Sequence, residues 1–89
     1  MEQSGALSRS VVLGHENGLH LTPITALVQC TTQFEAEVTL SFNGKSASAK
    51  SAVELMLLGA THGSLIAVEA EGVDAEQAID ATSEILEAR

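Results

Sequence analysis

One histidine in this chain stands where several sequence features could support chemistry. His20 follows the turn-forming pair Asn17 and Gly18 and comes three residues before Pro23, the only proline. Proline is favoured in the first turn of a helix because its missing N–H has no hydrogen bond to lose there. Apolar side chains then recur with a helical period, at Ile24, Leu27 and Val28. The pattern predicts a helix that begins next to His20.

A histidine at a helix N-terminus is suited to hold an anionic group. Backbone N–H groups of the first turn have no partner within the helix and, together with the helix dipole, favour a bound anion. Imidazole has an unperturbed pKa of about 6.5, so at pH 7 it is largely a neutral nucleophile. The backbone of Leu21 and Thr22 would stabilise a phosphoryl group on His20. We interpret His20 as a phosphorylation site, in preference to a helix cap or a loop histidine.

A second motif supports this interpretation. Residues 43–51 read Asn-Gly-Lys-Ser-Ala-Ser-Ala-Lys-Ser, and together with Asn-Gly-Leu-His-Leu-Thr-Pro at residues 17–23 they resemble HPr. HPr is the histidine-containing phosphocarrier family of the bacterial sugar phosphotransferase system. The resemblance covers residues 9–87 and keeps the family's spacing between the motifs. It implies an α+β open-faced β-sandwich, with a four-stranded, mainly antiparallel sheet and three helices on one face.

The resemblance also implies a function. His20 would accept a phosphoryl group on Nδ1 from a phosphohistidine of enzyme I and pass it to a sugar-specific phosphotransferase component. The protein would be a carrier without turnover of its own and would need no bound cofactor. Thr22 stands where family members usually have arginine, so a charge-assisted contact worth about 1.5–3 kcal/mol is missing. Lys45 or Lys50 could compensate for that missing charge.

Ser51 ends the second motif. The resemblance implies that a dedicated serine kinase, paired with a phosphorylase, modifies this residue in some bacteria. From the residues alone, Ser51 and Glu54 form a capping box, and this is the preferred explanation of the serine. The resemblance further implies a partner-docking surface around the middle helix and His20, with the candidates Thr25, Lys45, Lys50, Ala52, Val53 and Met56. The alternative for Val53 and Met56 is that they belong to the core.

Composition narrows the class of protein. At 89 residues, 45% of them apolar, we expect one small domain over residues 9–89, preceded by a frayed segment over residues 1–8. The net charge of −8 disfavours binding to nucleic acid or to a membrane surface. No apolar run approaches the roughly 20 residues of a membrane span, and residues 1–8 lack the features of a signal peptide. A single cysteine, Cys30, suits a reducing compartment. We expect a cytoplasmic monomer.

Hydrophobic periodicity and turn signals predict seven elements. Strands are expected over residues 9–14, 37–42, 45–48 and 65–70, with Asn43 and Gly44 forming a hairpin turn. Helices are expected over residues 21–32 and 52–58 and from residue 75 onward, with Asp74 as the cap of the last one. The order β-α-β-β-α-β-α fits a sheet that buries one face under helices and leaves the other exposed.

Two further functions stay open on the sequence alone. The chain could be an HPr-like regulatory module that signals through Ser51, or through the state of His20, without feeding sugar transport. It could also be a structural adaptor with an inert His20. A metal site is not predicted, because His15, His20 and His62 have no metal-ligand spacing and no paired cysteine.

Overall fold

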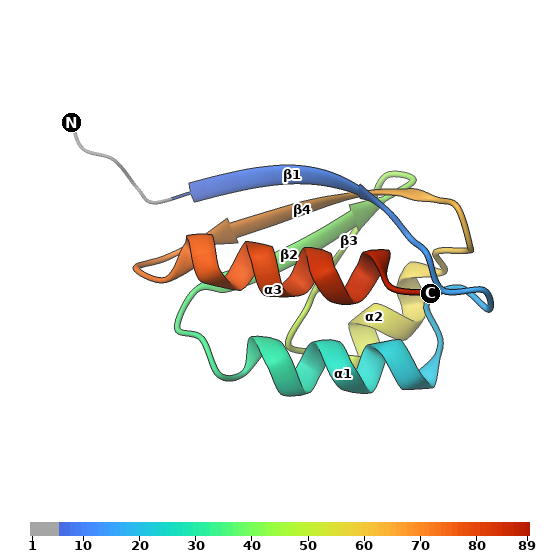
Figure 1. The fold of residues 1–89 in the computed structure, drawn as a ribbon, viewed down its shortest axis with the longest axis horizontal. Coiled ribbons are helices and arrows are strands. Elements are labelled where there is room, and N and C mark those ends of the chain that lie inside the picture. The colour runs from blue at the N-terminus through green and yellow to red at the C-terminus, as the bar shows by residue number, and fades with distance from the viewer. Residues whose placement is uncertain (1–5) are drawn as a thin grey trace.

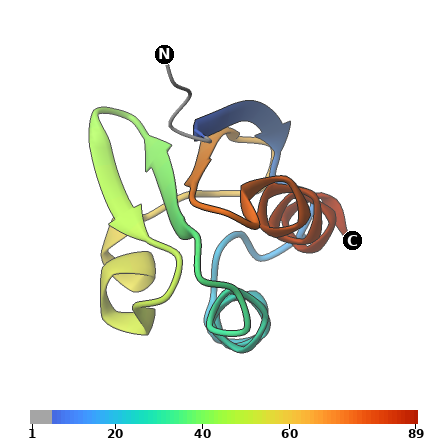
Figure 2. The same ribbon diagram turned by 90° about the vertical axis from the view of Figure 1, so that its left-hand side faces the viewer.

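The computed structural model describes residues 6–89. Its antiparallel sheet has four strands in the order β1-β4-β2-β3, and three helices cover one face (Figures 1 and 2). The strands and helices are β1 (Ala6–Val12), α1 (Leu21–Thr31), β2 (Glu37–Phe42), β3 (Lys45–Ser48), α2 (Ala52–Leu58), β4 (Leu65–Glu71) and α3 (Ala75–Glu87). The predicted α+β class, element order and open face are confirmed. No helix among the described residues is long and apolar enough to cross a membrane.

The start of β1 differs from the prediction. The sequence predicts fraying up to residue 8, but residues 6–8 pair with residues 69–71 of β4, so the prediction is wrong there. Residues 1–5 lie outside the described residues. Residues 6–8 are exposed on both faces of the sheet, so their sequence shows no alternation of apolar and polar side chains that would predict a strand. Their backbone hydrogen bonds to a strand distant in sequence hold them in place. β1 also ends before Gly14, whose N–H donates to the carbonyl of Leu86 in α3.

Local chemistry explains the remaining strand and helix boundaries. Asn43 and Gly44 both have positive φ, 54° and 81°, as a two-residue hairpin turn requires. Ser51 caps α2 by accepting a hydrogen bond from the N–H of Glu54, and Gly59 ends α2 in the left-handed conformation with φ 73°. The middle of the chain therefore folds as its sequence predicts.

Asp74 is the N-cap residue of α3, as the sequence predicts, but its side chain does not act as a cap. Its side chain makes no cap hydrogen bond to the helix. Instead its two carboxylate oxygens accept the N–H groups of Glu35 and Ala36, at 3.0 and 2.8 Å. Gly72 permits this arrangement, since a Cβ there would lie 2.7 Å from the Cα of Ala36. The carboxylate therefore joins the loop before β2 to the start of α3. It makes these hydrogen bonds in place of a cap hydrogen bond to the first turn of α3.

The core between sheet and helices is aliphatic. Val38 and Leu40 alternate inward from β2, and both are almost fully buried. The largest side chains with less than 2% exposure are Leu13, Ile24, Leu27, Leu40, Leu55, Ile66, Ile79 and Leu86. Both aromatic side chains, Phe34 and Phe42, pack at the margin of this core. The core holds α1, with His20 at its start, against α2 and α3.

Candidate functional site

The loop between β1 and α1 presents His20 at the start of a helix. Gly18 adopts φ 75°, and a Cβ there would lie 2.9 Å from the carbonyl oxygen of Ala60. The buried Leu19 donates its N–H to that same carbonyl at 3.0 Å. His20 then donates its N–H to the carbonyl of Gly18, also at 3.0 Å. The turn residues seen in the sequence therefore serve to bring this loop against the segment that follows α2.

His20 is the N-cap residue of α1, with extended backbone and a half-buried side chain. Its carbonyl accepts the N–H of Ile24, which closes the first helical turn. No hydrogen bond within residues 6–89 uses the N–H of Leu21 or of Thr22, and Pro23 has none to offer. The first turn of α1 also contains no acidic residue. Two free backbone N–H donors thus directly follow His20 at the N-terminal end of the helix, the end that favours an anion.

Neither lysine compensates for the absence of arginine at Thr22. Lys50 donates from Nζ to the carbonyl of Phe34 at 2.9 Å, beyond the last residue of α1. Because α1 has 11 residues, this contact is roughly 16 Å along the helix from His20. Lys45 is exposed at the start of β3, and no ion pair or hydrogen bond of the described residues joins a cation to His20 or Thr22. Among residues 6–89, therefore, no cationic side chain is bonded to His20 or Thr22 in place of the arginine.

Ser51 is the N-cap of α2 and is half-buried. Its Oγ lies 3.3 Å from the N–H nitrogen of Glu54, which donates to it. The carboxylate of Glu54 reaches back and accepts the N–H of Ser48 at 2.8 Å, where a capping box would use the N–H of Ser51. The cap predicted from the sequence is present, and an acidic side chain stands beside the serine hydroxyl.

Four apolar residues of α2 are exposed, at helical spacings of three and four, and we term them the α2 patch (Ala52, Val53, Met56 and Leu57). Val53 is 66% exposed and Met56 60%, which excludes the alternative that they are core residues. Leu57 is 70% exposed. The sequence does not single it out as a surface residue, because it lies within the apolar run 55–58. Its exposure follows from helical spacing, because Leu55 and Leu58 take the buried positions.

The α2 patch and His20 belong to the same end of the molecule. α2 packs beside α1 (Figures 1 and 2). Ala60, which follows the C-terminal end of α2, accepts the N–H of Leu19 in the His20 loop. On α1, the docking candidate Thr25 is exposed, and Leu21 is 70% exposed directly after His20. Exposed apolar side chains therefore occur both on α2 and at the residue that follows His20.

The other titratable side chains form no metal centre. No group of three histidine, cysteine, aspartate or glutamate side chains within residues 6–89 could hold a metal ion. His62 is exposed in the turn after α2, whereas His15 is half-buried, with Nε2 2.6 Å from the carbonyl oxygen of Ile85. Cys30 is half-buried as a free thiol, and burial raises its pKa. A raised pKa leaves less of the reactive thiolate at neutral pH.

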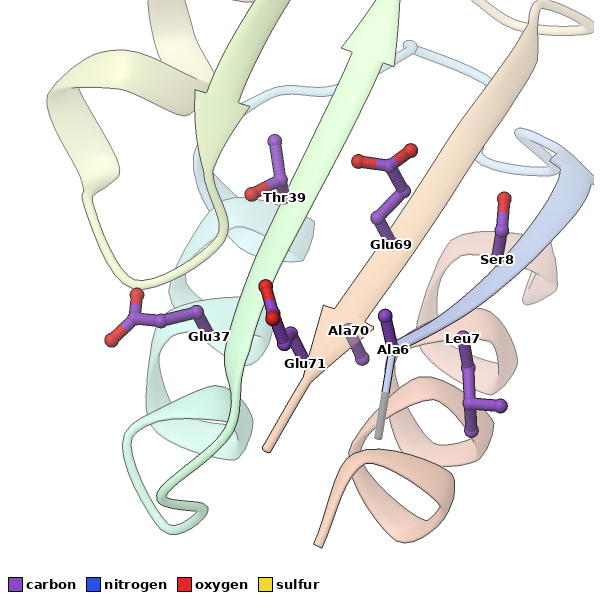
Figure 3. A pocket seen from close by; sticks show the side chains of 8 residues that line it. All are labelled: Ala6, Leu7, Ser8, Glu37, Thr39, Glu69, Ala70 and Glu71. Carbon is purple, nitrogen blue, oxygen red and sulfur yellow. The ribbon is translucent and has the colours of Figure 1, made fainter. Parts of the chain in front are cut away.

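A shallow hollow of about 240 Å³ lies on the open face of the sheet, across β1, β4 and β2 (Figure 3). Its lining includes three carboxylates, with Glu37 and Glu71 paired directly across β2 and β4. The helices lie behind the sheet in this view, so the hollow is on the face away from α1. It is separate from the His20 loop, and none of its described lining residues is a histidine, a cysteine or a cation.

Comparisons with known proteins agree with this architecture. Residues 7–88 match the family model described as the PTS HPr component phosphorylation site. A phosphocarrier protein HPr from Vibrio cholerae is 40% identical over 72 residues, which are 81% of this chain and 85% of that protein. The crystal structure of a phosphocarrier protein HPr from Bacillus anthracis has a TM-score of 0.87 at 32% identity, covering 91% of this chain and 96% of that one. An HPr dimer from Thermoanaerobacter tengcongensis has a TM-score of 0.72 at 31% identity, covering 86% and 88%.

Proposed function

Because the chain belongs to the HPr family of phosphotransferase-system phosphocarriers, we propose that His20 is the residue that carries its phosphoryl group. As a member of that family, the protein is a carrier and not an enzyme with independent turnover. The observation that supports the assignment to His20 is its position at the N-cap of α1, ahead of the free N–H groups of Leu21 and Thr22.

The proposed reaction is a transfer between two imidazole rings. The lone pair of a neutral His20 ring nitrogen attacks the phosphorus of a phosphohistidine on enzyme I. A new N–P bond forms at His20 while the donor's N–P bond breaks, and the electron pair of that bond stays on the donor nitrogen. No water and no net proton is consumed. Phosphoryl transfer depends mainly on positioning and charge stabilisation, which a small domain can supply.

We expect the start of α1 to stabilise the phosphoryl group on His20. The N–H groups of Leu21 and Thr22, with the helix dipole, face an anion attached to His20. The hydroxyl of Thr22 adds one neutral donor where the family usually supplies a cationic side chain. Charge-assisted hydrogen bonds are about twice as strong as neutral ones, so this carrier holds its phosphoryl group with weaker support. The missing cation affects transfer rate and equilibrium without removing the nucleophile.

The proposed partners are enzyme I as donor and a sugar-specific phosphotransferase component as acceptor. We assign docking to the α2 patch together with Leu21 and Thr25, because an exposed apolar surface beside the reacting atoms allows close approach. Lys45 remains an exposed candidate at the margin, whereas Lys50 is engaged with Phe34 and offers less to a partner. Docking is proposed to occur in the cytoplasm and to a monomer, since a net charge of −8 opposes self-association.

Phosphorylation with phosphoenolpyruvate and the cognate enzyme I tests the assignment. We expect intact mass spectrometry to show one acid-labile phosphate on the wild type and none on His20→Ala. His62→Ala is the matched control, because it removes an exposed histidine from a nearby turn and should still be phosphorylated. A phosphate that persists on His20→Ala, or a wild type that stays unmodified, would contradict the proposal.

A regulatory role through Ser51 is the second candidate. Its support is the half-buried hydroxyl at the N-cap of α2, directly before the α2 patch, where an added phosphate would change the docking surface. The helix dipole favours a phosphate at this position, but the carboxylate of Glu54 opposes it. Incubation with an HPr serine kinase and ATP tests the role. Acid-stable phosphate that is lost in Ser51→Ala and increased in Glu54→Gln would support it.

A further inference from the structure

The loop that carries His20 is attached to the far end of the chain through a second histidine. His15 lies five residues before His20, and its Nε2–H donates to the carbonyl oxygen of Ile85, with the two atoms 2.6 Å apart. Ile85 belongs to the last turn of α3, where carbonyl groups lack regular helical partners. Within residues 6–89, the one other donor to this carbonyl is the N–H of Ala88, at 3.4 Å. The imidazole therefore supplies the main hydrogen bond to this helix end.

The backbone of Gly14, next to His15, also attaches this loop to the C-terminal end of α3. Gly14 donates its N–H to the carbonyl oxygen of Leu86 at 2.9 Å. A Cβ at Gly14 would lie only 2.4 Å from the carbonyl oxygen of Glu87, so the position accepts no side chain without a shift of backbone. The loop thus rests on the C-terminal end of α3 through both a backbone and a side-chain contact.

Three consecutive hydrogen bonds lead from α3 to the backbone of His20. The ring of His15 donates to the carbonyl of Ile85 at 2.6 Å. The carbonyl of His15 accepts the N–H of Gly18 at 2.9 Å, and the carbonyl of Gly18 accepts the N–H of His20 at 3.0 Å. The His20 ring itself makes no hydrogen bond within residues 6–89. The backbone of His20 is thus tied to α3 by this path, in addition to the contacts of Leu19 with Ala60 and of Ile24 with His20 itself.

We propose that His15 is a positioning residue for phosphoryl transfer at His20. The inference rests on the proposed role of His20 and adds a residue that touches neither the phosphoryl group nor the partner. Transfer between two proteins requires the attacking nitrogen and the phosphorus to be aligned, and small displacements of a reacting group have large effects on rate. His15 acts by holding the loop in the orientation that aligns His20.

Three substitutions separate the hydrogen bond from the imidazole. His15→Ala removes the donor. His15→Gln places an amide N–H at about the same reach as Nε2 and restores it, whereas the shorter His15→Asn does not reach Ile85. Ile79→Val, in the buried face of α3, serves as a control that lowers global stability and leaves the hydrogen bond of His15 to Ile85 in place.

The first measurement is the single-turnover rate of phosphorylation by phospho-enzyme I, at a temperature where every variant is folded. We expect His15→Ala and His15→Asn to be about tenfold slower than wild type, with His15→Gln and Ile79→Val close to wild type. A wild-type rate in His15→Ala, or equal losses in His15→Ala and His15→Gln, would overturn the positioning role. Failure of the wild type itself would instead overturn the assignment of His20 and, with it, this inference.

The second measurement needs no phosphoryl donor. We expect amide hydrogen exchange at Gly18 and His20 to be about tenfold faster in His15→Ala and unchanged at Val38 and Val68, which lie in the central strands. Unchanged exchange at Gly18 and His20 would show that the loop holds its position without His15 and would contradict the proposal even if phosphorylation failed for another reason.

Discussion

Asp74 accepts the backbone N–H of Ala36 across 38 positions of sequence, with Oδ1 and the nitrogen 2.8 Å apart. The other carboxylate oxygen accepts the N–H of Glu35 at 3.0 Å. These hydrogen bonds favour the ionised carboxylate and hold the pKa of Asp74 below its usual value of 3.8. The bond from Glu35 lowers the pKa most, and the bond from Ala36 and the charge of Lys50 lower it further, while desolvation acts in the opposite direction. A single side chain thus links the start of β2 to the start of α3.

The stability contribution of Asp74 should depend on pH. A carboxyl group whose pKa is lower in the folded than in the unfolded state stabilises the fold above its unfolded value and loses that effect as pH falls through the folded value. We expect Asp74→Asn to melt below wild type at pH 7 and the difference to shrink below about pH 4. Thermal unfolding by circular dichroism from neutral to acidic pH would check this. A difference that stays constant with pH would show that the charge is irrelevant.

Restoring a cation at Thr22 should strengthen the carrier site. Thr22→Arg adds a guanidinium on the first turn of α1, next to the proposed phosphoryl group, where a charge-assisted contact is worth about 1.5–3 kcal/mol. We expect faster phosphorylation of His20 by enzyme I and slower hydrolysis of the phosphohistidine. Gln29→Arg adds the same charge two turns further along the exposed side of α1 and serves as control. Equal gains in both variants would indicate general electrostatic steering.

Two buried threonines should respond in opposite directions to the same substitution. Thr82 is fully buried, and its hydroxyl has no hydrogen-bond partner in the described part of the chain. Thr82→Val removes an unsatisfied polar group at nearly constant volume, and we expect a gain of about 1 kcal/mol in the free energy of unfolding. Thr31 is equally buried, but its hydroxyl donates to the carbonyl of Ala49 at 2.8 Å. Thr31→Val should cost about 1–3 kcal/mol, measured by urea denaturation. A loss of stability in Thr82→Val would reveal a partner for its hydroxyl.

The α2 patch should matter for transfer and not for folding. Met56→Ser removes an exposed apolar side chain, so the melting temperature should change little while the KM for enzyme I rises about tenfold. Leu65→Ser is the matched control, because Leu65 is 63% exposed on the open face of the sheet. Steady-state phosphorylation assays would measure both. Equal effects of the two substitutions would contradict docking at α2.

The sequence alone is enough to predict features that depend on neighbouring residues. In β2, Val38 and Leu40 are buried as predicted, whereas Phe42 on the same face is only partly buried. The pair Asn43 and Gly44 turns the hairpin, and Ser51 starts α2, both as predicted. The two motifs identify the family, and this prediction is confirmed. The place of His20 at the start of α1 also follows from its own turn and proline. These features are set within a few residues, where conformational preference and hydrogen bonding are local.

Only the tertiary structure decided what distant segments do to one another. Asp74 reads as a cap but binds the N–H groups before β2, and Lys50 reads as a free cation but binds the carbonyl of Phe34. His15 gives no local signal of its hydrogen bond to Ile85, 70 positions away. Each of these polar groups takes the partner that packing of the core brings within reach. That partner depends on how the helices lie on the sheet, a property of the whole chain that no short segment encodes.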